Sequence, residues 1–190
     1  MKKIIICLSS IFLFTAFADS VVSSGKVYIN GKEATKNSVV KLGDFIKTGK
    51  NSKVKFNIGK DAFLAKGDAK FSISEKAGVK SLNVVTGGVL AVFEKDGGNH
   101  EVKTENMTAG IRGTGVYLEQ KEGKAYFCTC YGETELSTHK EHKMYSATHH
   151  NMVWVKDDGS VKPAKSKEGH TDDDLRELEA MVGRIPDFDK

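Results

Sequence analysis

Short runs of alternating apolar and polar residues fill the first two thirds of the chain. The segment KVKFNI (53–58) places valine, phenylalanine and isoleucine at every second position, a period that is typical of a half-buried strand. Asn30-Gly31, between two such runs, predicts a tight hairpin turn. Runs of this kind recur at spacings of roughly ten residues up to Ser137, without a proline or a helical period. The pattern predicts an all-β domain of sandwich, barrel or solenoid type.

The C-terminal part, residues 138–190, combines a polar, histidine-rich loop, one last strand and a single short helix. Thr171 suits the helix N-cap, and three aspartates follow it at the positive end of the helix dipole. Gly183 and Pro186 end the helix. Its apolar stripe consists of Leu175, Leu178, Met181 and Val182. Because a helix of about three turns is marginal in water, we expect it to dock on the β-domain, which we place at residues 19–137.

Residues 1–18 have the three parts of a secretory signal peptide. A short basic start is followed by an apolar run (4–17), and Ala16-Phe17-Ala18 supplies the small residues of a cleavage site. The run is shorter than the roughly 20 apolar residues that span a bilayer, and no later segment approaches that length. We expect cleavage at about Ala18/Asp19, export to the periplasm or secretion, and no membrane insertion afterwards. An uncleaved N-terminal anchor is the alternative.

The charge pattern and the motifs exclude several classes of partner and activity. The formal net charge of +4 falls to +2 when Lys2 and Lys3 leave with the signal, and this mild balance argues against nucleic acid or an anionic membrane as the partner. The glycine-rich GIRGTG (110–115) lacks the ending of a phosphate-binding loop, so we interpret it as a structural turn. The sequence contains no nucleophile–base pair, paired-carboxylate cleft or cofactor fingerprint, and therefore predicts that the protein is not an enzyme.

Cys128 and Cys130 are the two cysteines that stay once Cys7 leaves with the signal. In a strand, residues two apart share a face, and their Cα atoms lie about 6.5–7 Å apart. A disulfide prefers a Cα separation of about 5.5–6 Å, so a bond between these two would be strained and easily reduced. Two thiolates on one tetrahedral metal ion lie about 4 Å apart, a distance that side chains on one face can reach. The pair therefore suits one half of a metal site.

Further ligands are expected among the histidines that follow the two cysteines. His149-His150 comes after a polar loop that returns from the cysteine strand, and we expect one of the two rings to face the thiols while the other is exposed. His170 stands directly before the expected helix, which can carry it to the β-domain. Together with Cys128 and Cys130 these residues form a mixed sulfur and nitrogen set that suits zinc, iron or copper.

Two other interpretations of the cysteine pair stay open. The cysteines can form a strained disulfide or redox pair, or they can be two small buried residues of a β-core beside solvated histidines. Exported thiols without protection tend to oxidise, which disfavours inert packing if the thiols are exposed. Asp172 and Glu177 are weaker candidate ligands than the histidines.

The stretch 25–136 carries several motifs in a set order. They are GDFIKTGKNS (43–52), GGVLAVF (87–93) and TAGIRGTGVYLEQ (108–120), the last leading through a strand into YGETEL (131–136). In this order they resemble the FecR domain, the exported domain of regulators that relay iron-siderophore signals across the envelope. The resemblance implies an all-β domain of solenoid or sandwich type, with a binding or signalling role and no catalysis.

A full regulator of this family carries a cytoplasmic anti-sigma segment and one membrane span ahead of the domain, and here we expect a cleavable signal in their place. We therefore expect an exported, non-catalytic binding or sensing module of FecR type, with an envelope protein as partner, in envelope signalling or metal handling. Its Cys/His cluster would hold a metal ion. One alternative is a redox or electron-transfer accessory protein with an iron or copper centre. Another is a structural interaction domain with a disulfide between the two cysteines.

Overall fold

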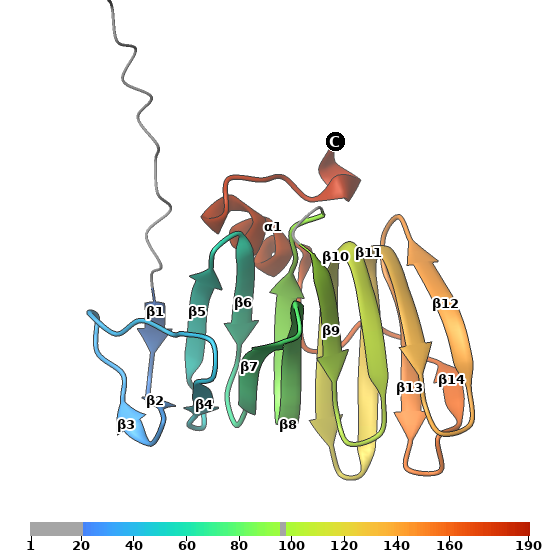
Figure 1. The fold of residues 1–190 in the computed structure, drawn as a ribbon, viewed down its shortest axis with the longest axis horizontal. Coiled ribbons are helices and arrows are strands. Elements are labelled where there is room, and N and C mark those ends of the chain that lie inside the picture. The colour runs from blue at the N-terminus through green and yellow to red at the C-terminus, as the bar shows by residue number, and fades with distance from the viewer. Residues whose placement is uncertain (1–20, 96–97) are drawn as a thin grey trace, which may run out of the picture.

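A computed structural model describes residues 21–95 and 98–190 of the chain (Figure 1). The expected signal peptide, residues 1–18, and its cleavage site lie outside the described residues. Within the two described ranges, no helix combines the length and apolar character needed to cross a membrane.

Fourteen strands of the described residues belong to one hydrogen-bonded sheet, and a single short α-helix, α1 (Asp172–Met181), follows them. The predicted fold class, all-β with one C-terminal helix, is confirmed. Neighbouring strands run antiparallel except for one parallel pair, β8 (Val79–Val92) with β9 (Asn99–Lys103). A one-turn 3-10 helix, η1 (Asp187–Asp189), ends the chain close to α1 (Figure 1).

The sheet folds over into two layers because its longest strands change partners half-way along. These are β8, β10 (Thr108–Lys121) and β11 (Lys124–Ser137). The second half of β10 pairs with the second half of β8, whereas its first half pairs with β9. The first half of β11 pairs with β13 (Asn151–Lys156), and its second half pairs with β12 (His142–Ala147).

The layer nearer α1 is called the helix-side layer here. Besides one half each of β8, β10 and β11, it contains β1 (Val21–Ser24), β5 (Lys53–Ile58), β6 (Asp61–Ala65), β13 and β14 (Val161–Pro163). The far layer contains the other halves together with β2 (Val27–Ile29), β3 (Lys32–Glu33), β4 (Phe45–Thr48), β7 (Lys70–Lys76), β9 and β12.

The glycine-rich segment 110–115 lies where β10 passes from one layer to the other. The pairing of β10 with β11 shifts register between Arg112 and Gly115, which marks a β-bulge, and bulges bend a strand and re-aim it. Gly113 takes φ +57° at this point, a conformation that a residue without Cβ adopts at little cost. The segment is thus a structural bend, as the sequence indicates.

Two apolar cores follow from this arrangement. The larger core lies between the layers and includes the stacked rings of Phe56, Phe63 and Phe71, with ring centroids 5.2 Å and 6.2 Å from Phe56. The smaller core lies on the outer face of the helix-side layer, where α1 covers it with Leu175 and Leu178. The expected docking of the helix on the β-domain is observed. Thr171 caps it in a capping box with Asp174, which satisfies backbone N–H groups at the helix start.

The histidine-rich segment after β11 contains more regular structure than its composition suggests. We expect a loop over this segment, and the structure places strand β12 in it. Of the six residues of β12 only Tyr145 is buried, so the segment has little apolar alternation to indicate a strand. Its backbone instead completes the hydrogen bonds of the second half of β11. The turn that joins β12 to β13 lies over β11 and carries His149 and His150.

A buried charged group at the start of β6 makes the stability of the fold depend on pH. Burial alone would raise the pKa of Asp61, but hydrogen bonds with His100, Lys80 and the Glu94 N–H outweigh burial and lower it. A carboxyl group whose pKa is lowered by folding stabilises the protein above its unfolded pKa of about 3.9, and this stabilisation is lost as the pH falls toward the folded pKa.

We therefore expect Asp61→Asn to lower the free energy of unfolding at pH 7 by about 2–4 kcal/mol, because the substitution leaves His100 and Lys80 without their buried carboxylate. The difference between wild type and variant should shrink below about pH 4. Urea unfolding measured from neutral to acidic pH checks this, with Asp173→Asn as a control because the side chain of Asp173 is 90% exposed. Equal stability of wild type and Asp61→Asn at pH 7 would contradict the assignment.

Candidate metal centre

The two cysteines lie on the outer face of β11, beneath the C-terminal segment. Cys128 pairs in register with Tyr117 of β10 and with Met152 of β13, so that the centre of the helix-side layer holds it in place. Both thiols are free and fully buried, and their Sγ atoms lie 3.7 Å apart. Their shared face is the one that the period of a strand predicts.

His150 reaches the cysteines from the turn between β12 and β13. Its backbone takes φ +56°, and its N–H donates to the carbonyl of Cys130 at 2.8 Å. This bond holds the β12–β13 turn against β11. The ring then lies with Nδ1 3.3 Å from Sγ of Cys128.

His170 approaches from the other side, on the loop that leads into α1. It stands directly before the N-cap Thr171, and its Nε2 lies 3.3 Å from Sγ of Cys130. The ring stacks on Tyr117 with centroids 4.6 Å apart and planes 22° apart. Gly169 allows the loop to pass this close to Tyr117, since a Cβ at position 169 would lie 1.9 Å from the tyrosine hydroxyl.

A hydrogen bond on the far side of each imidazole fixes which ring nitrogen faces the thiols. Nε2 of His150 lies 2.8 Å from the Asp172 carboxylate, and Nδ1 of His170 lies 2.8 Å from the carbonyl oxygen of Glu168. Both oxygens only accept, so each favours the tautomer of a neutral ring that carries its proton on the far nitrogen. In this tautomer the nitrogens that face the thiols have a free lone pair for a metal ion. Metal-ligating histidines have outer hydrogen-bond partners of this kind.

The distances match one tetrahedral ion. One ligand atom from each of Cys128, Cys130, His150 and His170 lies within 4.8 Å of all the others. Bond lengths of about 2.3 Å to sulfur and 2.0–2.1 Å to nitrogen place two sulfurs about 3.8 Å apart, and a sulfur and a nitrogen about 3.6 Å apart. The observed separations are 3.7 Å between the sulfurs and 3.3 Å for each close sulfur–nitrogen pair. These four residues are called the inner tetrad below.

The environment of the inner tetrad favours a thiolate at Cys128. A hydrogen bond from the Cys130 thiol, and then the interactions with the His150 and His170 rings, lower the pKa of the Cys128 thiol against the opposing effect of burial. Burial raises the pKa of Cys130, and the neighbouring Cys128 thiolate raises it further. Without a cation the pair thus carries about one negative charge, because two adjacent buried thiolates repel each other. A bound divalent ion would allow both thiols to ionise.

The structure brings four of the five sequence-predicted site residues together. His149, the fifth, lies outside the inner tetrad, with Nε2 2.9 Å from the Asp172 carboxylate. Of the weaker candidates, Asp172 contacts both adjacent histidines. Glu177 points elsewhere and forms ion pairs with Lys53 and Lys55.

Several residues around the site were not predicted from the sequence. Tyr117 and the Glu168 carbonyl orient His170, and the local sequence contains no signal for either. The position of Gly169 directly before a candidate ligand is a signal that was available, because glycine often marks a close approach of two chain segments.

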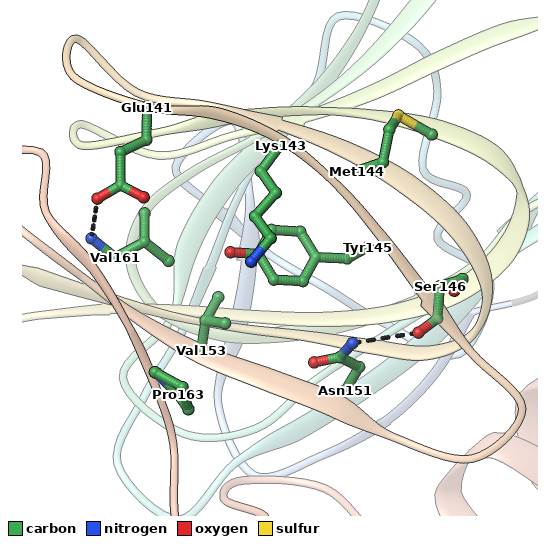
Figure 2. A pocket seen from close by; sticks show the side chains of 9 residues that line it. All are labelled: Glu141, Lys143, Met144, Tyr145, Ser146, Asn151, Val153, Val161 and Pro163. Carbon is green, nitrogen blue, oxygen red and sulfur yellow. Dashed lines mark hydrogen bonds between the residues drawn. The ribbon is translucent and has the colours of Figure 1, made fainter.

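A separate hollow of about 310 Å³ lies where β12 diverges from β13 and β14 (Figure 2). Its nine lining residues include no cysteine or histidine. Two of its polar side chains already have partners. Glu141 accepts from the N–H of Val161 at 2.9 Å, and Asn151 donates to the carbonyl of Ser146 at 3.1 Å. The hollow therefore offers no cluster of reactive groups comparable with the inner tetrad.

Known structures provide one comparison. Two crystal structures of a proposed anti-sigma factor from Parabacteroides distasonis ATCC 8503 match with a TM-score of 0.56 at 9% sequence identity. The chain and that protein share a fold. The match covers 71% of this chain and 64% of that one, so that this chain spans less than two thirds of its neighbour. No family model matches the chain, and no curated protein matches it in sequence. The shared fold is consistent with the FecR-type domain that the motifs resemble.

Proposed function

We propose that this protein is an exported, non-catalytic binding module of FecR type whose inner tetrad holds one metal ion. The observation that carries the proposal is the convergence of two thiols and two imidazole ring nitrogens on one point. They come from three separate parts of the chain: β11, the β12–β13 turn and the loop before α1. Zinc is the best-suited ion, because sites with two cysteines and two histidines are typical of tetrahedral zinc.

Charge also favours a divalent ion. Two thiolates and two neutral imidazoles carry two negative charges, which one divalent cation neutralises. A neutral centre suits this location, because Cys128 and Cys130 are fully buried and His170 is 5% exposed, and an uncompensated buried charge is costly. Four protein ligands leave no open position for a substrate, which supports a structural or sensing role rather than catalysis.

Metal binding in this arrangement would couple to the position of the C-terminal helix. His170 is the residue before the N-cap, and α1 covers the apolar outer face of the helix-side layer through Leu175, Leu178 and Val182. An ion held by His170 and β11 would fasten this end of the helix to the sheet. The protein would thus report metal supply to an envelope partner through the docked state of its C-terminal segment. The likeness to a proposed anti-sigma factor supports a role in signalling.

Metal content tests the proposal. Mature protein purified from the periplasm should contain about one equivalent of metal, and Cys128→Ser should contain almost none, since a site with three ligands binds zinc far more weakly. His142→Ala is a suitable control, because His142 forms an exposed pair with Glu135 and should keep the metal. A coloured iron or copper centre would favour an electron-transfer role, and a metal-free protein without free thiols would refute the proposal in favour of a disulfide.

A further inference from the structure

A second group of ligand atoms lies next to the inner tetrad and closer to solvent. His149, His150 and Asp172 bring one ligand atom each within 4.8 Å of one another. Nε2 of His149 lies 2.9 Å from one oxygen of Asp172, and Nε2 of His150 lies 2.8 Å from the other. These three residues are called the outer triad here. Two imidazole nitrogens and a carboxylate are a suitable set for a divalent transition metal.

The two groups differ in exposure. The side chains of His149 and Asp172 are 48% and 27% exposed, whereas the shared His150 is 8% exposed and both cysteines are inaccessible. An ion in solution can therefore reach the outer triad directly, but it cannot reach the thiols without passing the residues above them. Three ligands also leave positions for water, and a site of this kind exchanges its ion more readily than a closed tetrahedral site.

His150 faces both groups at once. Its Nδ1 points to Cys128 at 3.3 Å and its Nε2 points to Asp172 at 2.8 Å. Either nitrogen of a neutral imidazole can bind a metal, but only one of them is free of a proton. His150 can thus serve an ion in the outer triad or an ion in the inner tetrad, and its neutral ring does not bind both together.

We propose that the outer triad is a loading site, which captures the metal ion from solution and passes it through His150 to the inner tetrad. This inference rests on the proposed metal-binding function of the tetrad. In the transfer, the ring proton of His150 passes from Nδ1 to Nε2 as the ion moves from Nε2 to Nδ1, and the remaining thiol proton is released to solvent. No oxidation state changes, so that the transfer needs no redox partner. At equilibrium the ion occupies the four-ligand inner tetrad, and the outer triad determines how fast it arrives and leaves.

Lys167 occupies the place that an incoming ion needs. Its ammonium group pairs with the Asp172 carboxylate and lies 3.2 Å from Nε2 of His150. A cation that enters the outer triad must displace this charge, because two cations cannot share the carboxylate at such a distance without strong repulsion. The side chain is 30% exposed and can therefore swing into solvent. Lys167 thus acts as a competitor that slows loading.

Phe188 of η1 packs against His149, the exposed histidine of the outer triad, and holds its ring in position. Its ring lies 4.7 Å from that of His149, with the planes tilted by 38°, and His149 in turn lies 4.5 Å from His150. The substitution His149→Phe preserves an aromatic ring in this stack while it removes the ligand nitrogen. It is therefore a sharper probe of loading than a truncation, which would also disturb packing.

Isotope exchange in the zinc-loaded mature protein tests the proposal without any need for a metal-free state. An excess of isotopically enriched zinc is added, and the exchange of bound zinc is followed by mass spectrometry. His149→Phe should slow exchange roughly tenfold, because the ion loses a tethered ligand at the surface, while the zinc content and the equilibrium affinity stay at the wild-type values. Lys167→Gln should accelerate exchange by removing the competing charge. His142→Ala should exchange as the wild type does.

If His149→Phe exchanges zinc at the wild-type rate, the proposed loading site is wrong. The same holds if Lys167→Gln exchanges zinc at the wild-type rate or more slowly. A clear fall in the equilibrium zinc affinity of His149→Phe would also overturn it, because His149 would then be a ligand of the final site. If the wild type holds no zinc at the tetrad, the proposed function itself fails. The wild-type zinc content therefore separates the two outcomes.

Discussion

Removal of zinc should lower the melting temperature of the wild-type protein by about 10 °C and leave the double variant Cys128→Ser/Cys130→Ser unaffected. A ligand that binds only the folded state at a thousandfold excess over its dissociation constant adds about 4 kcal/mol of stability. In a chain of this size each kcal/mol corresponds to about 2–4 °C. The large effect follows from the location of the ligands, because the ion joins β11, the β12–β13 turn and the loop before α1.

Thermal unfolding with and without a chelator measures this difference. The double variant matters because serine has nearly the size of cysteine, so the buried face of β11 keeps its shape while it loses both thiolates. Its melting temperature should resemble that of the chelated wild type, and added zinc should not raise it. A wild-type melting temperature that is indifferent to chelator and to zinc would contradict a metal that stabilises the fold.

Gly169→Ala is expected to damage the site without touching a ligand. An alanine Cβ at this position would lie 1.9 Å from the hydroxyl oxygen of Tyr117, the residue whose ring stacks on His170. Either the loop or the tyrosine must move, and His170 lies next in the chain. We expect a loss of about 3 kcal/mol in stability from overpacking and backbone strain together, and a loss of about 10–100-fold in zinc affinity.

Gly78→Ala separates the two causes. Gly78 has φ +76° against +74° for Gly169, but a Cβ at Gly78 would meet nothing within 4 Å. This control carries the backbone strain alone, so it should cost about 1 kcal/mol in stability and leave zinc affinity unchanged. Urea unfolding and competition with a zinc chelator measure both quantities. If Gly169→Ala and Gly78→Ala change stability and zinc affinity equally, the contact between position 169 and Tyr117 does not position His170.

The sequence was most informative where one local rule decides the structure. The period of a strand places Cys128 and Cys130 on one face, and the structure has them so. The capping residue, the acidic first turn and the stop at Gly183 predicted the helix that the structure contains at Asp172–Met181. Each of these features depends on residues that are close together in the chain, which is why a single sequence can indicate them.

Features that depend on the path of the chain were harder to predict. The choice between His149 and His150 was open, because it depends on a turn in which His150 adopts φ +56° and bonds to Cys130 of a distant strand. Strand β12 was missed, because its polar side chains carry no apolar period and its pairing with β11 alone makes it a strand. Tyr117 stacks on His170, and Lys167 lies beside His150 and pairs with Asp172. These contacts form only when β10, the β12–β13 turn and the loop before α1 come together.

X-ray absorption of the zinc-loaded protein shows whether Cys128, Cys130, His150 and His170 together bind one metal ion. We expect the coordination shell of the zinc ion to contain two sulfur atoms at about 2.3 Å and two imidazole nitrogen atoms at about 2.0–2.1 Å. His150→Ala and His170→Ala should each remove one nitrogen from this shell, whereas His142→Ala should leave it intact. A shell of oxygen and nitrogen without sulfur would contradict metal binding by the inner tetrad, because it would place the ion away from the cysteines.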